Sequence, residues 1–241
     1  MDVIWSICRR DAIAAFTTPL AWLLLASWTM LTNGMFVYTL YSVHGKAAAS
    51  QPLFVDALEL GVFFLSLLAP AVTMTSFASE RVQGTMQLLL TAPIREHQLV
   101  LGKFLASFLV LAALVAATLV QPLILLFISQ VHSGQLAAGY LGLLLECAFF
   151  SALGCWISLL VDSPVAAYVL SFGAICVLML IGLAGSDGPL HPLTEALGLG
   201  SRVGPLFHGD VRLGNIVYFL GGTAGCLVLA HGALCARRIH G

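Results

Sequence analysis

Charged side chains are scarce in this sequence. Asp, Glu, Lys and Arg make up 9% of its 241 residues, and 60% of the residues are hydrophobic. An ordinary soluble domain carries about 25% charged residues. A soluble core of this length has no room for so much apolar surface, so lipid must cover part of it. The composition therefore excludes an ordinary soluble domain and predicts an integral membrane protein.

The motifs of common enzymes and metal sites are also missing. There is no GxxxxGK[ST] phosphate loop, no HExxH and no GxSxG, and the glycine run 198–204 misses the dinucleotide spacing by one residue. The cysteines form no CxxC, and we find none at ligand spacing from a histidine. Among the histidines, His191 and His208 are the only candidates for a pair. The sequence therefore predicts no catalytic residue, no metal site and no cofactor bound by this chain.

Long uncharged stretches occupy much of the chain, over 12–45, 60–79, 104–145, 163–186 and 213–236. A helix that crosses a bilayer needs about 20 apolar residues. The stretch 104–145 is about twice that length and is broken by His-Ser-Gly-Gln at 132–135, so we divide it into two spans. The sequence thus predicts an all-α integral membrane protein with six transmembrane helices, over 19–41, 54–77, 104–130, 137–160, 165–186 and 214–235.

The distribution of positive charge predicts the orientation. An even number of spans places both termini on one side, together with Arg9, Arg10, Arg81, Arg95, Lys103, Arg237 and Arg238. The opposite side holds Lys46, Arg202 and Arg212. Because the cytoplasmic side of a membrane protein carries the excess of Lys and Arg, we expect both termini to be cytoplasmic.

The whole chain, 1–241, is predicted to form a single transmembrane domain. Its first hydrophobic run is too long for a signal peptide, and we find no cleavage site at its end, so it is expected to remain as an anchor. Residues 1–18 are predicted to form an N-terminal helix that lies in the membrane interface. The alternative is that they form a cytoplasmic extension of the first span. The segment 187–213 is too apolar for a solvated loop and is predicted to fold back as an outer re-entrant segment.

The polar segment 78–103 separates the second and third predicted spans. Gly84 and Thr85 interrupt a helical stretch, and the run 88–90 contains three leucines. Pro93 suits the first turn of a following helix, where its missing N–H costs little. An exposed apolar cluster rimmed by charge marks a partner surface, whereas a helix lying flat would bury the same leucines in lipid. The residues alone leave both alternatives open.

A resemblance to a known family distinguishes between them. The pattern Glu80-Arg81-x-x-Gly84-Thr85-x-x-Leu88-Leu89-x-x-x-Pro93, followed by Leu101-Gly102-Lys103, resembles the first cytoplasmic loop of ABC-2 type transporter permeases. It is most similar to the GldF-like (gliding-machinery type) and copper-maturation-type permeases. Weaker similarity continues through 139–149, 154–158, 166–172, 207–209 and 215–219. The resemblance covers most of the chain, and its first motif is the specific one.

The resemblance implies a type V exporter-like permease fold in a bacterial inner membrane. Its partners would be a pair of ABC ATPase subunits that bind ATP and Mg, a second copy or homologous permease, and an auxiliary subunit with an extracytoplasmic domain; no nucleic acid is implied. The segment 78–103 would couple the permease to the ATPase. The residues that we assign to this coupling are Glu80, Arg81, Gly84, Thr85, Gln87, Leu88, Leu89, Leu90, Pro93 and Lys103. The family often has Glu at the position of Gln87.

Glu146 is the unusual charge inside a predicted span, at a position where the family is usually apolar. It lies about nine residues inside the fourth span, and a carboxylate near the bilayer centre costs about 2.5–3.5 kcal/mol on insertion scales. It is either part of a substrate or proton pathway or a carboxyl that is hydrogen-bonded to a neighbouring span. We group it with Phe207 and His208 of the outer segment as candidates for the pathway.

We therefore expect a permease subunit that couples ATP hydrolysis on a separate chain to export or to force transmission across the membrane. One alternative is a scaffold subunit of a larger complex that transports nothing. The other is a membrane-embedded enzyme, which would need polar residues clustered at one depth over several spans. The sequence shows Glu146 almost alone at its depth.

Overall fold

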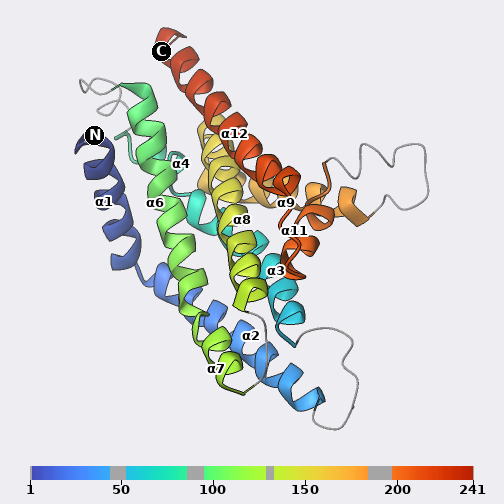
Figure 1. The fold of residues 1–241 in the computed structure, drawn as a ribbon. Coiled ribbons are helices and arrows are strands. Elements are labelled where there is room, and N and C mark those ends of the chain that lie inside the picture. Colours follow the sequence, from blue (N-terminus) through green and yellow to red (C-terminus); the bar gives the residue numbers. More distant parts are fainter. Residues whose placement is uncertain (1, 44–52, 86–94, 129–132, 184–196, 241) are drawn as a thin grey trace.

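The computed structural model describes residues 2–43, 53–85, 95–128, 133–183 and 197–240, and these residues form helices and no strand (Figure 1). In chain order the helices are α1 (Asp2–Thr17), α2 (Pro19–Val43), α3 (Leu53–Thr73), α4 (Ala78–Val82), α6 (Glu96–Ala117), α7 (Val120–Ile128), α8 (Ser133–Leu160), α9 (Pro164–Leu183), α11 (Leu199–Phe207) and α12 (Leu213–His240).

The described residues contain six helical stretches that are long and apolar enough to cross a membrane, as the sequence predicts. They are Pro19–Thr39, Val55–Val82, Glu96–Ile124, Ser133–Leu160, Pro164–Gly182 and Leu213–Ala236. The third begins at Glu96, and not near residue 104 as the sequence suggested. The predicted span is bounded by the uncharged stretch, which begins only after Lys103, although Pro93 indicates an earlier helix start. This helix is interrupted at Thr118 and Leu119, between α6 and α7.

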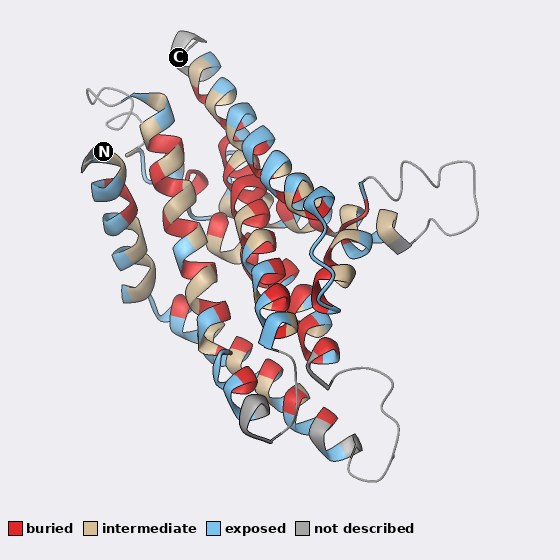
Figure 2. Ribbon diagram, in the orientation of Figure 1, coloured by how far each residue is buried: buried red, intermediate tan, exposed pale blue. Residues whose placement is uncertain are grey.

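Helix α8 is the centre of the bundle. More than half of its 28 residues are buried, and it contacts α3, α6, α9, α11 and α12 (Figure 2). Apolar side chains point outward from the surrounding helices, among them Trp22, Met30, Phe63, Val165 and Val228. Inside a bilayer the hydrophobic effect does not drive helices together, because lipid tails are as apolar as the side chains. Small residues that let two helix backbones approach closely therefore become important for packing.

Two glycines allow such approaches to neighbouring helices. A Cβ at Gly154 of α8 would lie 2.1 Å from Oγ1 of Thr73, at the end of α3. A Cβ at Gly222 of α12 would lie 2.7 Å from the Phe149 ring of α8. In contrast, Gly221 and Gly225 of α12, which are four residues apart in a GxxxG pattern typical of close helix contacts, meet no atom within 4 Å. The close contact on α12 therefore uses the glycine outside that pattern.

Helix α1 lies alongside the first half of α6 (Figure 1). Ile7 and Cys8 are buried there, and a Cβ at Gly102 of α6 would lie 2.8 Å from Cγ2 of Ile7. A helix is thus present over nearly all of the predicted N-terminal segment 1–18. Its position at a membrane interface stays a prediction.

Both described ends of the chain lie at the same end of the bundle as α4 and the start of α6 (Figure 1). The opposite end carries α7 and the start of α8. Within the predicted outer segment 187–213, the structure contains the short helix α11, which packs against α8 and α9. Residues 187–196 lie outside the described ranges.

Replacing Gly154 by Ala tests the contact between α3 and α8. We expect Gly154→Ala to lower the free energy of unfolding by about 1–3 kcal/mol, because the added methyl overlaps Thr73. The matched control is Gly173→Ala on α9, where no atom lies within 4 Å. Ala is favoured over Gly in a helix by about 0.5–1 kcal/mol, so this control should be neutral or stabilising. Thermal unfolding in detergent measures both, and equal melting temperatures would contradict the close contact.

Candidate functional site

The start of α4 is attached to the central helix through Ser158. The Ser158 hydroxyl accepts hydrogen bonds from the backbone N–H groups of Phe77 (3.2 Å) and Ala78 (3.1 Å). It also lies 3.4 Å from the Met74 carbonyl oxygen, to which it can donate. The first N–H groups of a helix have no partner within the helix, and here a buried side chain of α8 supplies one. The position of α4 is therefore set by α8.

Arg81 makes a second attachment to α8. Its guanidinium donates to the carbonyl oxygens of Leu159 (2.9 Å) and Val161 (2.7 Å), and it forms an ion pair with Asp162. The last carbonyls of a helix lack intrahelical partners and attract positive charge. Arg81 thus caps the end of α8 from within the chain.

Lys103 is the best buried charge of the segment 78–103. Its side chain is 3% exposed, and Nζ lies 2.8 Å from Oε1 of Glu80 and 3.1 Å from Oδ2 of Asp11. The ammonium also lies 5.1 Å from the centroid of the Phe77 ring. A buried cation is stable only if counter-charges and hydrogen bonds replace its lost hydration. Lys103 therefore joins α1, α4 and α6 at one point.

Arg10 completes this group, which we call the charge cluster: Arg10, Asp11, Glu80 and Lys103. Arg10 Nε lies 2.8 Å from Asp11 Oδ1, and one terminal nitrogen lies 3.3 Å from Glu80 Oε1. The hydrogen bond to Asp11 raises the pKa of the Arg10 guanidinium. Two cations and two anions leave the cluster with no net charge.

The charge cluster borders a cavity of about 380 Å³ between α1, α2, α3, α4 and α6. Asp11, Glu80 and Lys103 line one part of it, with Ser76 and Ser79 nearby in the lining. The other lining residues are mostly apolar, such as Ala21, Leu24, Ala71, Val72 and Val110. The cavity thus has both a charged and an apolar wall.

Gly84 and Thr85 end α4, in agreement with the interruption that the sequence predicts. Gly84 has φ of 71°, a left-handed conformation that favours glycine. Its N–H donates to the Arg81 carbonyl at 3.0 Å, and both N–H and hydroxyl of Thr85 donate to the Glu80 carbonyl, at 2.9 and 3.1 Å. This is the usual way in which a glycine closes a helix C-terminus.

The remaining predicted coupling residues, Gln87, Leu88, Leu89, Leu90 and Pro93, lie outside the described residues. The chain is described again from Arg95, whose N–H donates to Oε1 of Gln98 at 3.3 Å and so caps the start of α6. Of the predicted coupling residues, the structure thus brings together Glu80, Arg81 and Lys103 at the base of this segment. A role of any of these residues in coupling stays a prediction.

Glu146 lies at the middle of α8 and is fully buried. It is deeper in its helix than expected, because α8 begins at Ser133 and not near residue 137. Neither carboxylate oxygen has a hydrogen-bond partner among the described residues, so the described residues do not support the alternative of a carboxyl that is hydrogen-bonded to a neighbouring span. Other buried polar atoms in the described part of the chain also lack partners: Trp28 Nε1, Glu80 Oε2, Ser151 Oγ, Ser171 Oγ, Arg202 Nε and Asn215 Nδ2.

The structure separates the other two pathway candidates. Phe207 is buried at the end of α11 against Gly142 of α8, where a Cβ would lie 3.5 Å from its ring. Gly142 precedes Glu146 by one helical turn on the same face of α8. His208 is exposed, and His191 lies outside the described residues. Phe207 and Glu146 thus belong to one region, and His208 points away from the core.

Sequence reasoning missed several residues of these sites. Asp11 and Arg10 are 92 and 70 residues from their partners Lys103 and Glu80, and no local pattern reports a contact over that separation. Ser158 has no motif signal either. One signal was readable: Cys235 follows His231 by four residues on α12, which is one helical turn. The statement that no cysteine stands at ligand spacing from a histidine is therefore wrong.

Removing the Lys103 charge should destabilise the protein. We expect Lys103→Met to lower the free energy of unfolding by about 2–3 kcal/mol, which is less than for a fully buried ion pair because both carboxylates keep some solvent exposure. Arg9→Met, which removes an exposed cation of α1, is the control and should change little. Thermal unfolding followed by tryptophan fluorescence measures the difference. Equal stability of the two variants would show that the cluster does not hold α1 and α4.

An apolar residue at position 146 should stabilise the protein. Glu146→Leu removes two unpartnered oxygens from the core, and we expect a gain of about 1–3 kcal/mol in unfolding free energy. Glu146→Gln keeps the size and polarity of the side chain and serves as the control, with a smaller gain. The same unfolding measurement applies. A clear loss of stability in Glu146→Leu would mean that the carboxylate has a partner.

Comparison with known proteins gives a family for this architecture. The model of the ABC-2 family transporter protein matches residues 12–190. The chain is also 32% identical over 115 residues to a probable ABC transporter permease protein, NosY, of Pseudomonas aeruginosa; the alignment covers 46% of this chain and 41% of that relative. The family match includes Glu80 and Lys103 of the charge cluster, the segment 78–103 and Glu146, whereas Arg10 and Asp11 lie before it. The chain, whose described residues contain six helical stretches apolar and long enough to cross a membrane, belongs to the ABC-2 transporter family.

Proposed function

We propose that this chain is the permease subunit of an ABC-2 transporter in a bacterial inner membrane, driven by a separate ATPase subunit. The observation that carries the proposal is the Glu80–Lys103 ion pair. These two residues stand near the beginning and at the end of the predicted coupling segment, and the pair joins them at 2.8 Å. Family membership and the absence of a phosphate loop in the sequence support an ATPase on another chain.

The contacts of the segment suggest how a force would pass into the membrane. Arg81 and the start of α4 are hydrogen-bonded to α8, and Lys103 forms ion pairs with α1 and α4. A displacement of the segment by closing ATPase subunits would therefore move α1, α6 and α8 together. Rigid-body shifts of this kind are a common form of switching transition. The permease would work as a pair, with a second copy or a homologous permease, and with an auxiliary extracytoplasmic subunit as a further partner.

The transport pathway is proposed to pass the region of Glu146 and Phe207. A buried carboxylate without a partner is costly in a membrane, and such residues mark substrate and ion pathways. Phe207 packs one turn away on the same face of α8. His208 would then contact the substrate only at the exposed end of α11.

Co-purification tests the partner and its docking site. The wild-type chain and Leu89→Glu are purified from the native membrane in mild detergent, and the proteins that accompany them are identified by mass spectrometry. We expect an ATP-binding subunit to accompany the wild type and to be lost from Leu89→Glu. The reason is that a carboxylate is costly when it is buried in the apolar surface of the ATPase on which Leu89 is proposed to dock. Leu213→Glu is the matched control, because Leu213 is an exposed leucine at the start of α12.

Three outcomes separate the alternatives. Loss of the ATPase in Leu89→Glu alone supports docking through the segment 78–103. An ATPase that binds while its turnover does not respond to the permease would favour a scaffold subunit. If no ATP-binding protein accompanies the wild type even after crosslinking, the proposed function is wrong.

A further inference from the structure

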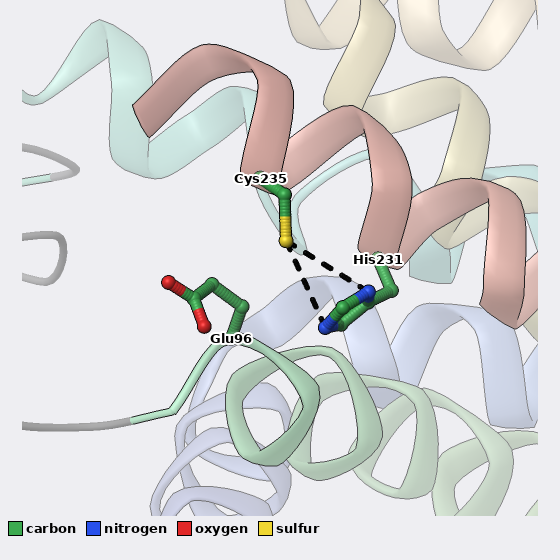
Figure 3. Close-up of side chains that lie close together, drawn as sticks. All are labelled: Glu96, His231 and Cys235. Carbon is green, nitrogen blue, oxygen red and sulfur yellow. Dashed lines mark hydrogen bonds between the residues drawn. The ribbon is translucent and has the colours of Figure 1, made fainter. Parts of the chain in front are cut away.

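Three potential metal ligands meet where the start of α6 approaches the end of α12 (Figure 3). Glu96 is the first residue of α6, and His231 and Cys235 lie one turn apart on α12. The ligand atoms of the three residues all lie within 4.8 Å of one another, and each residue is partly exposed. The Cys235 sulfur lies 3.8 Å from both ring nitrogens of His231.

We propose that Glu96, His231 and Cys235 bind a zinc ion that links α6 to α12. Zn²⁺ accepts thiolate, imidazole and carboxylate ligands in tetrahedral sites. Mg²⁺ and Ca²⁺ prefer oxygen ligands alone, and the softest metals prefer sulfur over a carboxylate. The mixture of one sulfur, one nitrogen and one oxygen donor therefore fits Zn²⁺ best.

The spacing fits a tetrahedral ion after small adjustments. Metal–ligand distances of about 2.3 Å for sulfur and about 2.05 Å for nitrogen place the two atoms about 3.6 Å apart at a tetrahedral angle. The observed separation is 3.8 Å. Because both ring nitrogens are equally distant from the sulfur, a rotation of the imidazole selects one of them as the ligand. The fourth position is left to water, which the partial exposure of all three residues admits.

A surface groove beside the site gives a bound ion a structural consequence. The groove, of about 300 Å³, runs between α6 and α12 and is lined by His97, Val100, Leu101, Leu227, Val228 and His231. An ion bound at its edge would fix the separation of the two helices. Glu96 is the first residue of α6, so the ion would also fix the start of this helix.

The ion would therefore act on coupling if the proposed function holds, but its binding requires neither ATPase nor substrate. The purified chain is enough to test it.

Cobalt substitution tests the site directly. Protein purified without a histidine tag and kept reduced is titrated with Co²⁺, which gives a near-ultraviolet charge-transfer band when a thiolate binds it. We expect the band to saturate at one cobalt per chain and to disappear when Zn²⁺ is added in excess. It should be absent in Cys235→Ser and retained in Cys176→Ser, which removes another partly buried, free cysteine.

The other two proposed ligands, His231 and Glu96, are tested by measuring the affinity of variants for Zn²⁺. His231→Asn and Glu96→Gln should each weaken Zn²⁺ binding at least about tenfold, as even changes outside the ligand set do at metal sites. Size-exclusion profiles establish that each variant is folded, and these two variants keep the test valid if Cys235→Ser does not fold. Absence of the band in the wild type, or its survival in Cys235→Ser, would overturn the proposal, as would unchanged affinity in both other variants.

Discussion

The burial of one ammonium group organises the end of the bundle that carries both termini. Lys103 is 3% exposed and lies in a helix that is otherwise apolar enough to cross a membrane. An unpaired charge there would cost several kcal/mol, so Asp11 of α1 and Glu80 of α4 have to be in place for α6 to adopt its position. The placement of α1 along α6 and of α4 beside Lys103 both depend on this requirement.

Helix α8 provides the fixed element against which that end is held. At its centre, Glu146 has no hydrogen-bond partner among the described residues, but the C-terminal turns of α8 bind α4 through Ser158 and Arg81. One turn before Ser158, Gly154 lets Thr73 of α3 approach to contact distance. The two ends of α4 and the end of α3 are thereby fixed to the same two turns of α8. A small element of one and a half turns gains a defined position that its own length could not provide.

The sequence predicted the parts of this structure that depend on composition and local spacing. Long uncharged stretches sufficed for six spans, and Gly84 and Thr85 sufficed for the end of α4, because a left-handed residue is a local requirement. The start of the third span was placed too late, since it was drawn from the uncharged stretch that begins after Lys103. The charge cluster and the contact of Glu96 with α12 stayed hidden, because no local pattern reports partners so distant in the chain. His231 and Cys235 were different, since their helical spacing was present in the sequence and was overlooked.

The order of the charges along the chain has a consequence for synthesis and insertion. Asp11 and Glu80 both precede Lys103, so the two counter-ions are made before the cation that they neutralise. At about 5–20 residues per second, Lys103 follows Glu80 by only about 1–5 seconds. The helix that carries the buried ammonium thus leaves the ribosome when both acidic partners are already available. The negative charges that Lys103 needs are therefore already synthesised when its helix reaches the membrane.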